Sequence, residues 1–412
     1  MKRSDQHVRP SSSLRQPAIT AMVLALFFLA GVSGAQAQTI TVLHSFTGGA
    51  DGSGPLVGVT LDPQGRIYGT VPDGGSHSQG VVFRLVHQGD GWVFTPIYAF
   101  GSQENDGNLP EARVLFGPDG LLYGTTYSGG SKGYGTVFRL QPPAAACKAA
   151  LCPWLETILY NFTGKADGGN PFLGDLAFDQ AGNIYGTTAY GGSSSYGVIF
   201  KLARSGSSWT ESVLWDFTCG NDGCNPYAGV IFDSLGNLYG TTQFGGTFGE
   251  GTVYELSPTQ SGWSETTLTA AAPNGSFSGG LAIDSHGDLF GITGNVEPGA
   301  VYEVAQQNGS WSLKVLKSFN QIFFLGPLAA PTLDAQGNLY GPVPNGGSDE
   351  GGEIFKLAPS GGVWIYSDYH DFANGGGEYP IGAVTFDASG NMYGTANGGG
   401  VDGGGTVWEI TP

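Results

Sequence analysis

Residues 232–240 read Phe-Asp-Ser-Leu-Gly-Asn-Leu-Tyr-Gly, an Asp-x-x-Gly turn followed at once by a Leu-Tyr-Gly phrase. The Asp can cap a tight hairpin, and the Gly can supply the positive φ that such a turn needs. Similar phrases occur seven times, at residues 67–69, 122–124, 184–186, 238–240, 289–291, 339–341 and 392–394. Their spacing averages about 54 residues, which is typical of a β-propeller blade and too long for a leucine-rich or ankyrin unit.

A second signal within each unit is a Trp that precedes a Phe by eight residues. The pairs are Trp92 and Phe100, Trp154 and Phe162, Trp209 and Phe217, Trp311 and Phe319, and Trp364 and Phe372. An even separation places both aromatic residues on one face of a strand, where the neighbouring blade can bury them. Eight tryptophans could instead form a sugar-binding platform, but the repeated slot favours the core interpretation.

The ends of the chain predict how the ring closes. Each unit has four strand-like runs, but the last unit stops one strand short, after Trp408-Glu409-Ile410. Residues 41–46 (Thr-Val-Leu-His-Ser-Phe) match the outer strand at residues 157–162 (Thr-Ile-Leu-Tyr-Asn-Phe). Pairing the two ends would remove free sheet edges. We therefore predict an all-β, seven-bladed propeller of four-stranded blades over residues 38–412, closed by the N-terminal strand pairing with the C-terminal blade.

The first 37 residues have the order of a secretory signal peptide: basic residues, an apolar run from Ala18 to Val32, and Ala35-Gln36-Ala37. The apolar run is shorter than the roughly 20 residues of a transmembrane helix. We expect cleavage before Gln38 and a secreted or periplasmic monomer with no membrane insertion. Cleavage removes four positive charges and one negative charge, so the net charge of −18 becomes −21. So acidic a surface makes nucleic acid an improbable partner.

The four cysteines form two close pairs, Cys147 with Cys152 and Cys219 with Cys224. In an exported protein, this spacing favours two local disulfides, each of which would hold one loop. A shared zinc site is the alternative, although the spacing matches no common zinc module.

The YGTT-type phrase, the Gly-Gly loop that follows it, the G-x-VF-x-L strand and the terminal Phe resemble the bacterial tandem-repeat proteins called choice-of-anchor GloVer-containing proteins. The resemblance covers essentially the whole mature chain. It implies an exported repeat protein, often with a C-terminal sorting anchor, and it brings no activity or functional residue. We expect this chain to lack the anchor, because it stops at Thr411-Pro412 directly after a strand-like run.

An Asp-Gly-x-x-Pro motif joins consecutive units in the first half of the ring and is absent from the second half. Its aspartates are Asp51, Asp106, Asp167 and Asp222. Calcium binding is one interpretation, but equivalent atoms of adjacent blades lie roughly 9 Å apart, whereas ligands of one ion must lie closer. Asp-Gly is also an ordinary turn former, so structural turns are the alternative. Apart from this possible calcium, we expect no cofactor.

Three charged residues depart from the repeat near the predicted axis. Glu111 and Arg113 start a strand in which the positions equivalent to Arg113 are Gly58, Gly229, Gly280, Ala330 and Ala383. Asp175 would lie beside Arg113, although one extra residue in the third unit could place Gly174 there instead. We interpret Glu111, Arg113 and Asp175 as candidate ligand contacts, with an internal salt bridge as the alternative.

A propeller fold alone does not specify a function. We find no G-x-S-x-G, H-E-x-x-H or phosphate-binding loop, so nothing in the sequence demonstrates catalysis. The first hypothesis is a non-enzymatic binding module for a glycan, polymer or protein outside the cytoplasm. The second is a metal-assisted hydrolase resembling lactonases, with its site at the central mouth, and the third is a purely structural surface protein. Three or more carboxylates or Asn at the axis would favour the enzyme, and exposed aromatic residues on the rim would favour binding.

Overall fold

A computed structural model of the chain describes residues 38–143, 153–206, 208–270, 275–294, 298–322, 329–347, 350–372 and 376–412. The regular secondary structure of these ranges is entirely β. Within them, no helix has the length and apolar character needed to span a bilayer. The predicted signal peptide at residues 1–37 lies outside the described residues.

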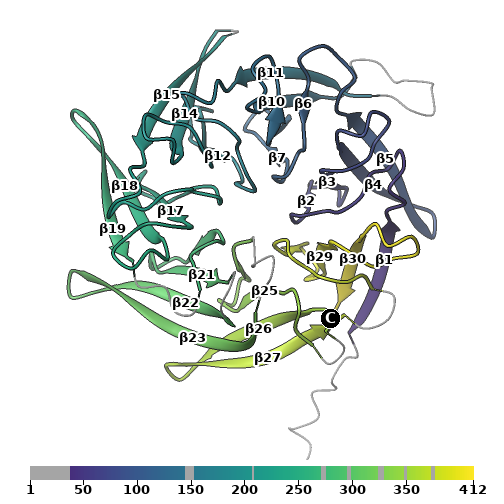
Figure 1. The fold of residues 1–412 in the computed structure, drawn as a ribbon. Coiled ribbons are helices and arrows are strands. Elements are labelled where there is room, and N and C mark those ends of the chain that lie inside the picture. Colours follow the sequence, from purple (N-terminus) through teal and green to yellow (C-terminus); the bar gives the residue numbers. More distant parts are fainter. Residues whose placement is uncertain are drawn as a thin grey trace, which may run out of the picture. The chain divides into compact units, whose positions relative to one another are not determined.

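Seven antiparallel four-stranded sheets surround a common axis as the blades of a propeller (Figure 1). From the innermost strand outward, blade 1 has β2 (Thr60–Leu61), β3 (Ile67–Val71), β4 (Val81–Gln88) and β5 (Gly91–Ala99). Blade 2 has β7 (Leu115–Phe116), β8 (Leu122–Thr126), β10 (Thr136–Gln141) and β11 (Leu155–Asn161). Blade 3 has β12 (Ala177–Phe178), β13 (Ile184–Thr188), β14 (Val198–Ser205) and β15 (Ser208–Asp216).

The remaining blades repeat this order. Blade 4 has β16 (Ile231–Phe232), β17 (Leu238–Thr242), β18 (Thr252–Thr259) and β19 (Gly262–Thr269). Blade 5 has β20 (Leu281–Ile283), β21 (Leu289–Thr293), β22 (Pro298–Gln307) and β23 (Ser310–Ile322). Blade 6 has β24 (Thr332–Leu333), β25 (Leu339–Val343), β26 (Glu353–Ser360) and β27 (Val363–Asp371). Blade 7 has β28 (Thr385–Phe386), β29 (Met392–Ala396), β30 (Thr406–Thr411) and β1 (Thr39–Ser45).

The composition of blade 7 confirms the predicted ring closure. Strand β1, from the N-terminal end of the propeller, is the outermost strand of the blade that ends the chain (Figure 1). It runs antiparallel to β30, with Thr39 opposite Thr411 and Ser45 opposite Thr406. The pairing covers the edge of β30, which would otherwise be an unpaired sheet edge.

The hairpin between the first and second strands is the predicted Asp-x-x-Gly turn in six of the seven blades, and in blade 2 Gly117 takes the place of the Asp. In blade 4, Asp233 Oδ1 accepts hydrogen bonds from the backbone N–H groups of Leu235 and Asn237, at 2.8 and 2.9 Å. Gly236 has a φ of +90°, which is the left-handed conformation that favours glycine. The Asp-x-x-Gly signal therefore forms a capped turn.

The glycine of the Tyr-Gly phrase has a different role, because it lets an aromatic ring lie against the backbone. A Cβ atom on Gly124 would lie 2.7 Å from the ring of Phe138, on the adjacent strand of the blade. The equivalent Gly394 lies under Trp408, where the same distance would be 2.3 Å. Close ring packing, rather than a turn, explains this glycine.

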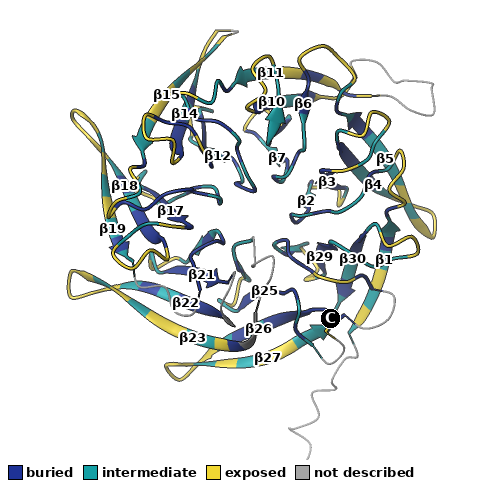
Figure 2. Cartoon of the chain, in the orientation of Figure 1, coloured by how far each residue is buried: buried dark blue, intermediate teal, exposed yellow. Residues whose placement is uncertain are grey.

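The tryptophans of the outer strands belong to the core, as predicted. Trp154 packs edge-on against Tyr68 of the preceding blade, with 6.0 Å between the ring centroids. Trp92 contacts Tyr393 of blade 7 in the same way, at 6.4 Å. The phenylalanines at the far end of these strands are buried as well, with Phe100 fully covered. The second strand of each blade is buried, and the outermost strands alternate mainly between exposed and partly buried residues (Figure 2).

Two kinds of loop share one face of the ring, which we call the loop face. One kind leads from the outermost strand of a blade to the innermost strand of the next, and the other joins the second and third strands of a blade. Backbone bridges connect them, as between Gly169 and Tyr190 and between Cys224 and Phe244. This pairing places two loop segments from each of these blades side by side around the mouth of the ring.

Candidate functional site

The innermost strands surround a central channel with a cavity of about 530 Å³. One position per blade recurs in its wall, and the residues there are Gly58, Arg113, Asp175, Gly229, Gly280, Ala330 and Ala383. The sequence allowed either Gly174 or Asp175 at this position in blade 3, and the structure places Asp175 there. The small residues let the strands approach closely, since a Cβ atom on Gly229 would lie 2.1 Å from the carbonyl oxygen of Asp175.

Arg113 and Asp175, two of the predicted ligand contacts, form an ion pair in the channel wall. Arg113 donates from Nη2 and Nε to Oδ2 of Asp175, at 2.5 and 3.1 Å. The pair joins blades 2 and 3 and remains partly exposed, with 22% of the Arg113 side chain and 36% of the Asp175 side chain accessible. The arrangement is the internal salt bridge that the sequence left as the alternative.

The boundary between blades 2 and 3 also lacks a hydrogen bond that other boundaries have. Thr70 and Thr187 donate from Oγ1 to carbonyl oxygens of the next blade, at 3.0 and 2.8 Å. The equivalent Oγ1 of Thr125 is buried and has no partner among the described residues. The extra residue in the third unit, near Leu173 with its φ of +33°, accounts for the lost register at this boundary. Here the Arg113–Asp175 pair makes the connection instead.

The four aspartates of the Asp-Gly-x-x-Pro motif cap their own loops. The carboxylates of Asp51, Asp167 and Asp222 accept hydrogen bonds from backbone N–H groups four residues earlier, at 3.0, 2.9 and 2.9 Å. Asp106 accepts from the N–H groups of Gly101 and Ser102, at 2.8 and 3.0 Å. Each carboxylate thus stabilises one turn, and the described residues contain no group of three or more His, Cys, Asp or Glu that could hold a metal ion. Calcium binding stays a prediction.

Three of these aspartates have a glutamate neighbour that sequence reasoning missed. The glutamates are Glu156, Glu211 and Glu265, each two residues after the Trp of an outer strand. Burial and the charge of Asp106 raise the pKa of Glu156 to about 8. Burial and the charge of Asp167 raise the pKa of Glu211 to about 7. Burial also raises the pKa of Glu265, with the charge of Asp222 adding to it. In the sequence, these glutamates could have been found by their shared position two residues after the Trp. That position does not show which aspartate each glutamate lies near.

A group of aromatic residues lies on the loop face near the channel mouth, in blades 2 to 4. We call Tyr127, Phe172, Tyr190 and Tyr227 the aromatic arc. The rings of Tyr127 and Phe172 are 5.7 Å apart between centroids, and those of Phe172 and Tyr227 are 4.8 Å apart. The hydroxyls of Tyr190 and Tyr227 lie 3.3 Å from each other. These residues come from four loops of three consecutive blades, so the arc forms only when these blades pack against one another.

Polar atoms without partners flank the aromatic arc. Glu111 immediately follows Pro110, as Phe172 follows Pro171 and Tyr227 follows Pro226, so it holds the equivalent position in blade 2. Its Oε2 is buried and has no hydrogen-bond partner among the described residues. Burial and the charge of Asp73 raise the pKa of Glu111 to about 7.

The opposite flank of the arc lies at the boundary between blades 4 and 5. Gln243 occupies the position equivalent to Tyr127, and Ser278 the position equivalent to Tyr227. Their side chains are only 7% and 4% exposed. Gln243 Oε1 and Ser278 Oγ have no hydrogen-bond partner within the described part of the chain. An unpaired buried polar atom is costly, and a ligand group could satisfy it.

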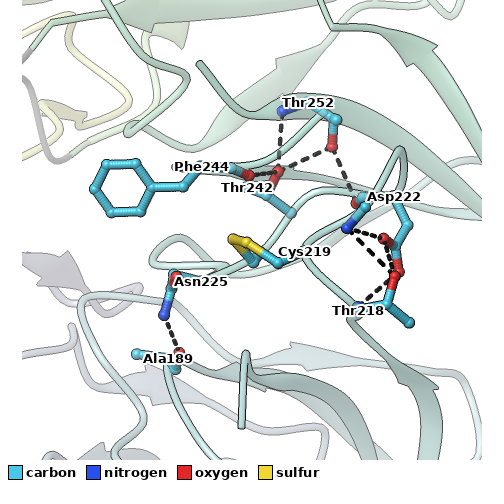
Figure 3. The surroundings of a disulfide bond; sticks show 10 residues. Ala189, Thr218, Cys219, Asp222, Asn225, Thr242, Phe244 and Thr252 are labelled. Atoms are coloured by element: carbon cyan, nitrogen blue, oxygen red, sulfur yellow. Dashed lines mark hydrogen bonds between the residues drawn. A yellow bond between two sulfur atoms is a disulfide. The ribbon is translucent and has the colours of Figure 1, made fainter. Parts of the chain in front are cut away.

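A disulfide fixes one loop beside the arc. Cys219 and Cys224 are bonded, as predicted, and their Cα atoms lie 4.5 Å apart (Figure 3). The backbone N–H of Cys224 donates to the carbonyl of Phe244 at 2.8 Å. Asn225 donates from Nδ2 to the carbonyl of Ala189 at 2.9 Å (Figure 3). These bonds hold the chain just before Tyr227. The predicted Cys147–Cys152 bond lies outside the described residues.

The chain matches a family of repeat proteins in sequence and several solved structures in fold. The model of the Gloeobacter/Verrucomicrobia repeat matches residues 32–151 and 154–329. No curated protein matches the chain. Among solved structures, the chain is similar to the extracellular domain of a protein from B. thetaiotaomicron described as a one-component system, with 11% identity and a TM-score of 0.51. That match covers 90% of this chain and 40% of the other.

A second similar structure is one described as a 6-phosphogluconolactonase from Bacteroides uniformis. It has 16% identity and a TM-score of 0.50, and the match covers 80% of this chain and 86% of that one. At such low identity, both likenesses concern the propeller fold alone.

Proposed function

The chain belongs to the Gloeobacter/Verrucomicrobia repeat family, and from this premise we propose that its propeller is an exported binding module that holds a saccharide on the aromatic arc. The predicted signal peptide and the Cys219–Cys224 disulfide support export, because disulfides persist in oxidising compartments. The module is proposed to act by binding rather than by catalysis.

The observation that carries this proposal is the combination of aromatic faces and unpartnered polar atoms at one mouth of the ring. Binding sites for small molecules typically combine aromatic walls with a few well-placed polar groups. Sugar rings present C–H faces that can stack on Tyr127, Phe172 and Tyr227, and hydroxyls that can satisfy Gln243 Oε1 and Ser278 Oγ.

Other exposed aromatic residues on the loop face favour a ligand longer than one sugar ring. Phe244 and Phe248 of blade 4 are 43% and 67% exposed, and Tyr196 of blade 3 is 40% exposed. They lie in the loops between the second and third strands of their blades. Aromatic residues of this kind are enriched where proteins contact a partner.

A glycan array followed by calorimetry with the mature protein tests the proposal. We expect Phe172→Ala to weaken binding at least about tenfold, since an aromatic residue at the centre of an interface commonly contributes more than 1.4 kcal/mol. Leu235→Ala is the matched control, because Leu235 is 82% exposed in a turn that joins the first two strands of blade 4. A Phe172→Ala protein that binds as tightly as the wild type would refute the arc as the site.

The alternative hypotheses have tests of their own. For a metal-assisted hydrolase, the relevant assay is calcium-dependent melting, with Asp51, Asp106, Asp167 and Asp222 changed to Asn. A calcium-induced rise in melting temperature that the variant loses would support a metal site. The absence of binding to any glycan, together with no metal effect, would favour the purely structural role.

A further inference from the structure

Glu111 is the charged residue at the blade 2 end of the site. The equivalent positions in blades 3 and 4 hold Phe172 and Tyr227, so an acidic side chain takes the place of an aromatic ring. Its carboxylate forms no ion pair among the residues that the structure describes. Arg113, two residues later, is already bound to Asp175.

Further negative charge surrounds this carboxylate. Asp73 lies in the loop of blade 1 that bridges to Ser53, and this loop contacts the Glu111 loop at Gly80, where a Cβ atom would lie 2.4 Å from the ring of Pro110 and 2.8 Å from the carbonyl oxygen of Pro72. The charge of Asp73 helps to raise the pKa of Glu111. Tyr127 of the aromatic arc lies beside the same segment, because its backbone N–H donates to the carbonyl of Leu109, two residues before Glu111, at 2.9 Å. Without the predicted signal peptide at residues 1–37, which carries a net +3, the net charge of −18 becomes −21. A positively charged group would be attracted to this point, and a negatively charged group repelled.

The surroundings favour an organic cation over a metal ion. Calcium takes six to eight oxygen ligands, and two neighbouring carboxylates fall well short of that number. No group of three or more potential metal ligands occurs in the described part of the chain. An ammonium group needs fewer partners: one or two carboxylates as hydrogen-bond acceptors and the face of an aromatic ring.

We propose that the ligand of the aromatic arc carries a free ammonium group, which binds between Glu111 and Tyr127. The inference rests on the proposed function and deepens it: the ligand is an amino sugar oligosaccharide, whose rings stack along Phe172 and Tyr227. The ammonium group pairs with the Glu111 carboxylate, and Asp73 adds a second negative charge. Gln243 and Ser278 hydrogen-bond hydroxyl groups at the other end.

A pair of probes that differ only in charge tests this inference by calorimetry. One is a β-1,4-linked glucosamine tetramer, and the other is the same tetramer fully N-acetylated. We expect the mature protein to bind the cationic tetramer on the order of 10- to 100-fold more tightly, the range of charge-assisted hydrogen bonds and cation–π contacts. Glu111→Gln should remove that difference. Glu104→Gln, which neutralises an exposed carboxylate earlier in the same connection between blades 1 and 2, should keep it.

The other possible results overturn either the ammonium assignment or the saccharide-binding proposal. Equal binding of both tetramers, unaffected by Glu111→Gln, would overturn the ammonium assignment while the saccharide-binding proposal stands. Binding of neither tetramer, with other glycans bound on the array, would have the same meaning. Binding of no glycan would overturn the proposed function itself. Calcium chloride alone giving a heat that depends on Glu111 would overturn the inference in favour of a metal site. Melting curves of Glu111→Gln establish that the variant is folded.

Discussion

Glu156 makes the stability of the ring depend on pH, and the direction follows from its surroundings. The side chain is 7% exposed, and its Oε1 has no partner among the described residues. Its pKa rises from 4.5 to about 8 because burial disfavours the ionised form and because Asp106 repels it. Asp106 itself is held by backbone N–H groups of Gly101 and Ser102. At neutral pH, Glu156 is therefore protonated in the folded protein and ionised in the unfolded chain.

Below about pH 4.5, Glu156 is protonated in both states, and its contribution to stability is fully present. Between pH 4.5 and about pH 8, only the folded state holds the proton, so the free energy of unfolding falls by about 1.4 kcal/mol per pH unit. Above pH 8 the folded carboxyl ionises as well and the loss levels off. A pKa change from 4.5 to about 8 amounts to a loss on the order of 5 kcal/mol.

Glu156→Gln removes this titration and keeps the shape of the side chain. Near pH 5, the variant and the wild type should differ by less than about 1 kcal/mol, because a neutral amide replaces a neutral acid. At pH 9, the variant should be more stable by roughly 3–5 kcal/mol. Urea unfolding of both proteins between pH 5 and pH 9 measures the difference, and Glu104→Gln, in an exposed loop position, is the control. Parallel stability curves for wild type and Glu156→Gln would refute the reasoning.

Three further changes test the architecture. Deleting residues 39–46 removes β1 and should unfold the ring or make it oligomerise through the exposed edge of β30, as light scattering would show. Gly124→Ala forces a Cβ against the ring of Phe138 and should destabilise the protein by about 1–3 kcal/mol in urea unfolding. Cys219→Ser with Cys224→Ser opens a short loop and should cost about 2 kcal/mol in the same assay. An unchanged monomer or unchanged midpoints would contradict the respective prediction.

The candidate site was only partly predictable. Arg113 and Asp175 stood out because they interrupt a run of small residues at one repeat position, and the structure pairs them in the channel wall. The motif aspartates also stood out, but as possible ligands for an ion, and their carboxylates cap the loops. The sequence of one repeat does not distinguish an Asp that caps a turn from an Asp that binds a ligand, because both occur in the same Asp-Gly-x-x-Pro motif.

Local rules let the sequence alone determine the fold of this protein. The Asp-x-x-Gly turns, the alternation along the outer strands and the repeat of about 54 residues each depend on a few neighbouring residues, so one chain is enough to count seven blades. The incomplete last unit and the matching strand at residues 41–46 determined the closure for the same reason.

Only the tertiary structure shows which residues of different repeats contact one another. Phe172 and Tyr227 are far apart in sequence, yet their rings lie 4.8 Å from each other because the ring brings equivalent loops of adjacent blades together. Glu156 and Asp106 come from different segments of the chain, and the raised pKa of Glu156 follows from its burial in the folded ring and from the nearby charge of Asp106. The Gly of the Tyr-Gly phrase is required by a ring on the neighbouring strand. Such contacts depend on the distance between elements after packing, which a repeat pattern does not encode.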